Sequence, residues 1–190
     1  MKKEIPCHLI AGFLGSGKST FIKQLLTYKA ADEKWAVLVN ELGNSKYPRE
    51  HYQANNIFVK EVHGGCLCCS AGMPFRVALN NLIKQVNPDR LFIEPAGAGH
   101  LANIQRLLEG QFYRPVLQLK AVICILSEEQ LSDNKYAQNE GYLALIAQAD
   151  KLCINNNLAT AQAIKMAEKY AKPLYLLQGS KKDLDFITQP

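Results

Sequence analysis

The sequence of 190 residues has no apolar run that approaches the roughly 18 residues needed by a membrane-spanning helix. Its first apolar stretch is interrupted by glycines and passes into a polar motif, so it does not resemble a secretory signal with a small-residue cleavage site. We therefore expect a cytoplasmic protein that has no membrane partner.

The sequence also has no basic stripe, although its formal net charge is +5. Lysines and arginines are scattered, and adjacent pairs occur only at Lys2–Lys3 and Lys181–Lys182. We expect no nucleic-acid partner, because a nucleic-acid-binding surface usually gathers basic residues on one face or helix.

Internal repeats, low-complexity tracts and linkers are missing too, while 48% of the residues are hydrophobic. That content is enough for one core, so we expect a single domain over residues 1–190.

Cysteine is not scarce, but nothing indicates an oxidising compartment. In a reducing cytoplasm, clustered thiols are more often metal ligands or redox groups than structural disulfides. Cys7, Cys124 and Cys153 lie inside apolar runs, and we expect them in the core.

Apolar runs rich in β-branched residues alternate with segments whose apolar residues recur every three or four positions. The first kind predicts strands at 5–11, 35–40, 56–62, 90–94, 116–126, 151–155 and 173–177. The second kind predicts helices at 18–30, 74–86, 101–110 and 158–171. This alternation indicates an α/β fold with a doubly wound, mostly parallel sheet flanked by helices. The polar stretch at 44–56 is predicted to be a long exposed loop.

A glycine-rich motif, "GFLGSGKS", follows the first predicted strand and leads into a helix. It fits the phosphate-binding pattern G-x-x-x-x-G-K-[ST], in which backbone amides and a helix N-terminus surround phosphates. Lys18 is expected to reach the β- and γ-phosphates and to be catalytic, and Ser19 is expected to bind Mg²⁺. The predicted nucleotide-binding residues of this P-loop are Gly12, Gly15, Ser16, Gly17, Lys18, Ser19 and Thr20. The alternative is a glycine-rich turn with a chance Lys-Ser.

Acidic residues end two of the predicted strands. Glu94 closes the strand at 90–94, where its carboxylate is suited to hold Mg²⁺ directly or through water. Asn40 ends the strand at 35–40 and Glu41 follows it directly, and Glu41 is our candidate for positioning the attacking water or its metal. Either acid also fits an ordinary polar residue at a point where a strand reaches the surface.

Three cysteines form the motif C-x-C-C at Cys66, Cys68 and Cys69. Adjacent cysteines form a disulfide only with strain, whereas thiolates are good ligands for Zn²⁺, Cu(I) and similar ions. Three thiolates leave one position of a tetrahedral ion open to water, His63 or a partner's side chain. A redox pair and buried apolar cysteines are the alternatives.

Together these motifs resemble those of the CobW-like GTPases, the class that also includes HypB and UreG. The matching segments are "GFLGSGKST" at 12–20, "VNELG" at 39–43, "GGCLCC" at 64–69 and, less closely, "EPAGAG" at 94–99. The resemblance covers roughly residues 5–155. It implies a metallochaperone or metal-trafficking factor that hydrolyses GTP with Mg²⁺ and binds Zn²⁺ or a related divalent transition metal at the three cysteines. It also implies a client metalloprotein and leaves a homodimer open. We expect the smaller C-terminal domain common in the family to be absent.

The base-reading motif of the family, N-K-x-D, is only partly present. Asn155 keeps its first position, and Asn156 and Leu158 replace Lys and Asp. A site without that carboxylate loses a partner for the guanine base. The sequence therefore leaves open whether the ligand is GTP or ATP. It also leaves open whether hydrolysis is weak. A non-catalytic module that docks on a partner is the alternative function.

Overall fold

The computed structural model describes residues 4–41, 47, 49–63, 72–154, 158–178 and 180–188. For Glu41, Arg49, Glu50, His51, His63, Leu184, Ile187 and Thr188 it describes the backbone alone. None of the helices in these ranges is long and apolar enough to cross a membrane.

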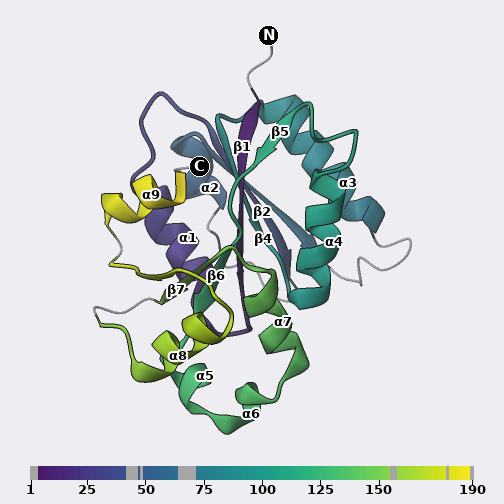
Figure 1. Ribbon diagram of the computed structural model, residues 1–190. Helices are drawn as coiled ribbons and strands as arrows, with labels where there is room; N and C mark the ends of the chain where they lie inside the picture. The colour runs from purple at the N-terminus through teal and green to yellow at the C-terminus, as the bar shows by residue number, and fades with distance from the viewer. Residues whose placement is uncertain are drawn as a thin grey trace.

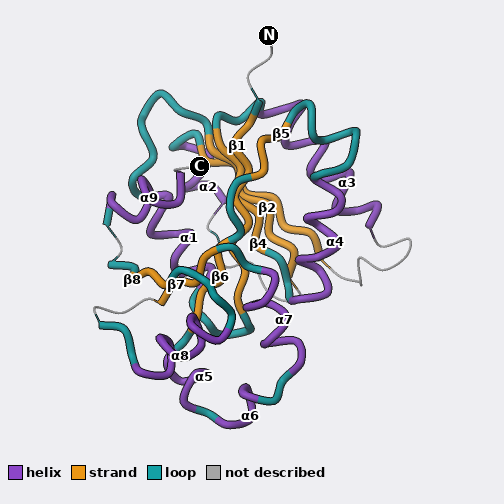
Figure 2. The backbone as a smooth tube through the Cα atoms, viewed as in Figure 1, coloured by secondary structure: helices purple, strands orange, loops and turns teal. Residues whose placement is uncertain are grey.

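A sheet of eight strands forms the centre of the molecule (Figures 1 and 2). Its order is β3-β2-β4-β1-β6-β7-β8, with β5 also paired to β1, and every described pairing is parallel. The strands are β1 (Ile5–Gly12), β2 (Trp35–Glu41), β3 (Ile57–His63), β4 (Arg90–Glu94), β5 (Leu117–Leu119), β6 (Ile123–Leu126), β7 (Lys151–Ile154) and β8 (Leu174–Leu176). The predicted fold class is confirmed.

Helices cover both faces of the sheet. Helices α1, α2 and α9 lie on one side, and α3, α4 and α7 lie on the other (Figure 1). The helices are α1 (Lys18–Leu26), α2 (Arg49–Ala54), α3 (Gly72–Asn81), α4 (Ala98–Leu108), α5 (Glu128–Ser132), α6 (Asn134–Ala137), α7 (Glu140–Gln148), α8 (Ala161–Lys169) and α9 (Lys181–Thr188). A π-helical turn, Leu82–Val86, extends α3.

Side chains of β2 alternate between two cores, as the period of two in a strand requires. On β2, Trp35, Val37 and Val39 belong to the core that contains Phe21 and Ile22 of α1. Their neighbours Ala36 and Leu38 belong to the opposite core, with Phe75 and Leu79 of α3. The sheet is therefore buried on both faces, which explains the near-continuous apolar runs of its strands.

Three expectations about individual segments are corrected. The stretch at 44–56 contains α2, a short helix that packs against β3, and the side chain of Tyr47 is buried. The apolar run at 116–126 forms two strands that lie on the same side of β1, separated at 120–122. The segment at 128–148, for which no helix was predicted, contains α5, α6 and α7.

Candidate functional site

The carboxyl ends of β1, β4, β2 and β3 are neighbours in the parallel sheet. In the register, Glu94 of β4 pairs with Val39 of β2, and Glu41 pairs with His63 of β3. The P-loop follows β1 at the same edge. Parallel α/β folds place their ligand sites at this edge, so the sequence motifs converge where such a site is expected.

The P-loop closes tightly between β1 and α1. A Cβ atom on Gly12 would lie 2.7 Å from the carbonyl oxygen of Ile125 and would clash with Ser16 Oγ, at a φ of 151°. Gly17 adopts the left-handed conformation that begins α1. That helix has no side-chain cap and no acidic residue in its first turn. Its first amides thus remain available to an anion, which is the arrangement of a phosphate site.

The P-loop side chains point in different directions. Lys18 is buried, and its Nζ donates a hydrogen bond to the carbonyl oxygen of Phe13 at 3.0 Å, which holds the ammonium across the loop. Ser16 is also buried, and its Oγ has no hydrogen-bond partner among the described residues. Gly15 and Thr20 are exposed. A polar atom left unpaired here fits a loop built for a ligand with acceptor oxygens.

Ser19 and Glu94, which are 75 positions apart in the sequence, meet at the base of the P-loop. The Ser19 hydroxyl donates to Glu94 Oε1 at 2.7 Å, and Glu94 is only 2% exposed. A hydroxyl beside a buried carboxylate is an oxygen donor set of the kind that Mg²⁺ prefers. The residues present therefore fit a magnesium ion held between the P-loop and β4.

Tyr47 is a third member of this cluster, and sequence reasoning missed it. Its hydroxyl donates to the other oxygen of Glu94, Oε2, at 3.0 Å. Burial and then the nearby Glu94 charge raise the pKa of Tyr47 far above its usual value, so the phenol stays a neutral donor. The only sequence signal was a large aromatic residue within a polar stretch.

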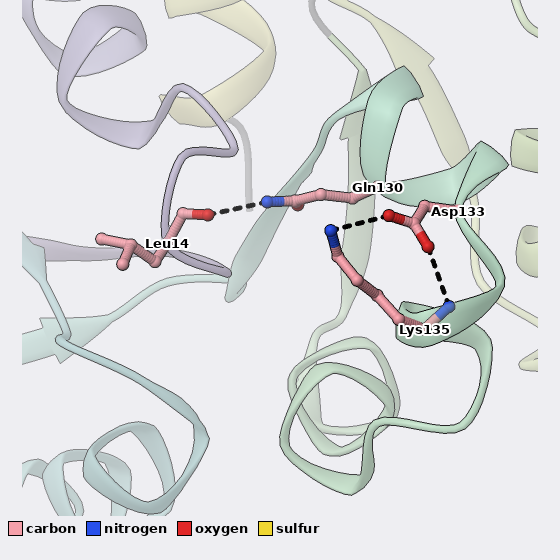
Figure 3. Close-up of polar contacts among 4 residues, drawn as sticks. All are labelled: Leu14, Gln130, Asp133 and Lys135. Carbon is pink, nitrogen blue, oxygen red and sulfur yellow. Dashed lines mark hydrogen bonds and ion pairs between the residues drawn. The ribbon is translucent and has the colours of Figure 1, made fainter.

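A second set of contacts connects the P-loop to the helices that follow β6 (Figure 3). Gln130 of α5 donates through Nε2 to the carbonyl oxygen of Leu14 at 2.7 Å. The ring of Phe13 packs edge-on against Tyr142 of α7, with the centroids 5.8 Å apart. Farther along, Asp133 caps α6 and forms an ion pair with Lys135 at 2.7 Å on the exposed side. Residues 13 and 14 are thereby held in place from two helices.

The end of β2 is only partly described. Asn40 is 5% exposed, and its Nδ2 has no hydrogen-bond partner within the described part of the chain. Glu41 is placed at the carboxyl end of β2 by its backbone, and its side chain is not described. Its catalytic role therefore stays a prediction.

The predicted transition-metal ligands, Cys66, Cys68 and Cys69, lie outside the described residues, as does Asn155. The backbone of β3 ends at His63 beside Glu41, at the same edge of the sheet as the P-loop, and the cysteine segment follows His63 in the sequence. Within the described ranges, no group of three or more His, Cys, Asp or Glu side chains forms a metal site.

The other three cysteines are buried, as predicted. Burial raises the pKa of Cys124 to about 12 and raises those of Cys7 and Cys153 further. These thiols therefore remain protonated and act as small apolar core residues.

Comparisons with known proteins match this chain to one protein family. The family model described as "CobW/HypB/UreG, nucleotide-binding domain" matches residues 6–181. The zinc chaperone YeiR of Escherichia coli K12 is 44% identical over 160 residues, which cover 84% of this chain and 49% of YeiR. The zinc chaperone YjiA of the same organism is 26% identical and is covered over 59% of its length, with 94% of this chain aligned. The chain thus spans about half the length of these relatives.

Solved structures agree on the fold. The crystal structure of zinc-bound YjiA from E. coli superposes with a TM-score of 0.66 at 20% identity, and covers 94% of this chain and 59% of that one. The structure of HypB from Helicobacter pylori in complex with nickel gives 0.64 at 18% identity, with coverage of 96% and 84%.

Proposed function

The chain belongs to the CobW/HypB/UreG family of nucleotide-binding domains, and we propose that it is the nucleotide switch of a zinc metallochaperone. One observation carries the nucleotide half of this proposal: Ser19 of the P-loop lies 2.7 Å from the buried carboxylate of Glu94. Three cysteines that follow β3 closely in the sequence carry the metal half. The relative YeiR, 44% identical to this chain, is named a zinc chaperone.

The P-loop would bind the phosphates of GTP or ATP. Amides at the start of α1 would donate to phosphate oxygens, and Lys18 would exchange the Phe13 carbonyl for the β- and γ-phosphates. Ser19 and Glu94 would hold Mg²⁺, which neutralises charge on the phosphates when bound. Asn155 would contact the base.

Hydrolysis would depend on positioning and charge rather than on a covalent intermediate. Glu41 ends a strand that is hydrogen-bonded to β4, so its carboxylate is a candidate to orient a water for in-line attack on the γ-phosphate. Lys18 would stabilise the charge that develops on the transferred group.

Zinc, or a related divalent ion, is the cargo in this proposal. Cys66, Cys68 and Cys69 would bind it as thiolates, and the open fourth position would let a client metalloprotein take it over. Glu94, Glu41 and His63 belong to adjacent strands, so a change at the phosphate site has a short path to the cysteine segment. Nucleotide state would then alter zinc affinity by linkage.

The nucleotide half is tested with Lys18→Ala, matched by Lys165→Ala on the exposed face of α8. We expect Lys18→Ala to weaken binding of fluorescent GDP or ADP at least tenfold, because charge-assisted hydrogen bonds to phosphate are lost. Lys165→Ala should bind like the wild type. Equal binding by both variants would contradict the P-loop assignment.

The alternative function is a non-catalytic module that binds nucleotide and docks on a partner. Asn156 and Leu158, where the family carries Lys and Asp, favour this alternative. Phosphate release from GTP and from ATP, with and without Zn²⁺, separates the two functions. Retained binding without phosphate release from either nucleotide would support the module and exclude the hydrolase.

A further inference from the structure

The carboxylate of Glu94 is held on both oxygens. Ser19 donates to Oε1 at 2.7 Å, and Tyr47 donates to Oε2 at 3.0 Å. Glu94 and Tyr47 are 2% and 3% exposed, so water has little access to replace either donor. The oxygens of a carboxylate buried in this way depend on protein donors for their hydrogen bonds.

Two helices fix the ring of Tyr47. The Nζ atom of Lys23, on α1, lies 5.3 Å from the ring centroid, and the ring of Tyr52, on α2, lies at 6.1 Å. Tyr47 itself belongs to the segment between β2 and α2. Its hydroxyl therefore reaches Glu94 from a different part of the chain than the P-loop does.

We propose that Tyr47 is a positioning residue of the magnesium site, which holds the Glu94 carboxylate in the orientation that faces Ser19. This inference rests on the proposed function, in which Ser19 and Glu94 receive the ion. A serine hydroxyl that binds a cation does so through an oxygen lone pair, and its hydrogen can still be donated to Glu94 Oε1. Tyr47 holds the other oxygen, Oε2, so the two donors together fix the rotation of the Glu94 carboxylate.

The test compares Tyr47→Phe with Tyr52→Phe. Both changes remove one phenolic oxygen and keep the ring, but only the first removes a hydrogen bond to Glu94. The probe is fluorescent GDP, or ADP if the wild type prefers it, titrated with MgCl₂. We expect Tyr47→Phe to raise the Mg²⁺ concentration for half-maximal tightening about tenfold, since a hydrogen bond to a charged group is lost. Tyr52→Phe should match the wild type.

Binding in EDTA distinguishes positioning of the ion site from general damage. We expect Tyr47→Phe to bind the nucleotide without Mg²⁺ as the wild type does. We also expect the double variant Tyr47→Phe, Glu94→Gln to need the same Mg²⁺ concentration as Glu94→Gln alone, because the partner of the phenol is already changed. A loss of affinity in EDTA, or an additive effect with Glu94→Gln, would show a structural role and overturn the proposal.

The outcomes also separate this inference from the function on which it rests. A wild type whose nucleotide affinity responds to Mg²⁺, with Tyr47→Phe and Tyr52→Phe both unchanged, would refute the role of Tyr47 and leave the switch intact. A wild type that binds nucleotide identically with and without Mg²⁺ would remove the magnesium site, and both proposals with it.

Discussion

Gly12 lies where β1 becomes the P-loop, with the carbonyl oxygen of Ile125 and the hydroxyl of Ser16 directly beside its Cα. Its φ of 151° is one that residues with a side chain rarely adopt. The backbone at this position therefore requires glycine for two separate reasons, space and conformation.

We predict that Gly12→Ala lowers the free energy of unfolding by about 1–3 kcal/mol and weakens nucleotide binding, because β1, β6 and the loop must separate to admit the methyl group. Gly99→Ala on α4 is the matched control, since a Cβ there meets no atom within 4 Å. Alanine favours a helix over glycine, so the control should be neutral or slightly stabilising. Urea unfolding of both variants measures the difference, and equal stabilities would contradict this account of Gly12.

At the scale of residues, sequence patterns found Lys18, Ser19 and Glu94 because each stands at a defined offset in a motif or at the end of an apolar strand. Tyr47 could not be found in this way. Its role depends on a hydroxyl that meets a carboxylate 47 positions away, and no periodicity records such a contact. The side-chain geometry of Cys66, Cys68 and Cys69 stays a prediction.

At the scale of elements, α5 is a short helix that supports the P-loop from outside. Gln130 is 5% exposed, and its amide donates to Leu14 at 2.7 Å, while its Oε1 has no partner among the described residues. One strong hydrogen bond thus connects the helix after β6 to the tip of the loop.

We predict that Gln130→Ala lowers nucleotide affinity several-fold and the free energy of unfolding by about 1 kcal/mol, since the loop loses a buried hydrogen bond. Glu129→Ala is the control, because Glu129 is the exposed neighbour on the same helix. Nucleotide titration and urea unfolding of the two variants check this. If Gln130→Ala bound nucleotide as tightly as Glu129→Ala, α5 would have no part in positioning the loop.

Strands were predicted well because a sheet buried on both faces needs continuous apolar runs, and seven such runs are present. The run at 116–126 was predicted as one strand but forms two, since no periodicity marks the interruption at 120–122 that separates β5 from β6. Helices α5 and α6 were missed because they span only five and four residues. Helix α7 was missed because its residues 142–147 are all apolar, so no helical spacing of apolar and polar residues marks it. Their caps Asp133 and Asn139 were the available signals.

At the scale of the whole molecule, parallel pairing gathers four strand ends at one edge. Along that edge lie, in this order, the P-loop after β1, Glu94 on β4, Glu41 on β2 and His63 on β3. Two hydrogen-bonded strands, β4 and β2, thus lie between the P-loop strand and β3, which the cysteines follow in the sequence. Since coupling between two binding sites is reciprocal, nucleotide should change zinc affinity, and zinc should change nucleotide affinity by the same factor.

The most direct test is a zinc titration against a chromophoric chelator, made on the nucleotide-free protein and again with Mg²⁺ and GDP or a non-hydrolysable GTP analogue, or their adenine counterparts if those bind better. We predict zinc affinities that differ between these states by about fivefold or more. We also predict loss of this zinc site in a variant that carries Cys66→Ala, Cys68→Ala and Cys69→Ala. Two results would contradict a metal-linked nucleotide switch. One is zinc binding by the cysteine variant that equals that of the wild type, and the other is a wild-type zinc affinity that is the same with and without bound nucleotide.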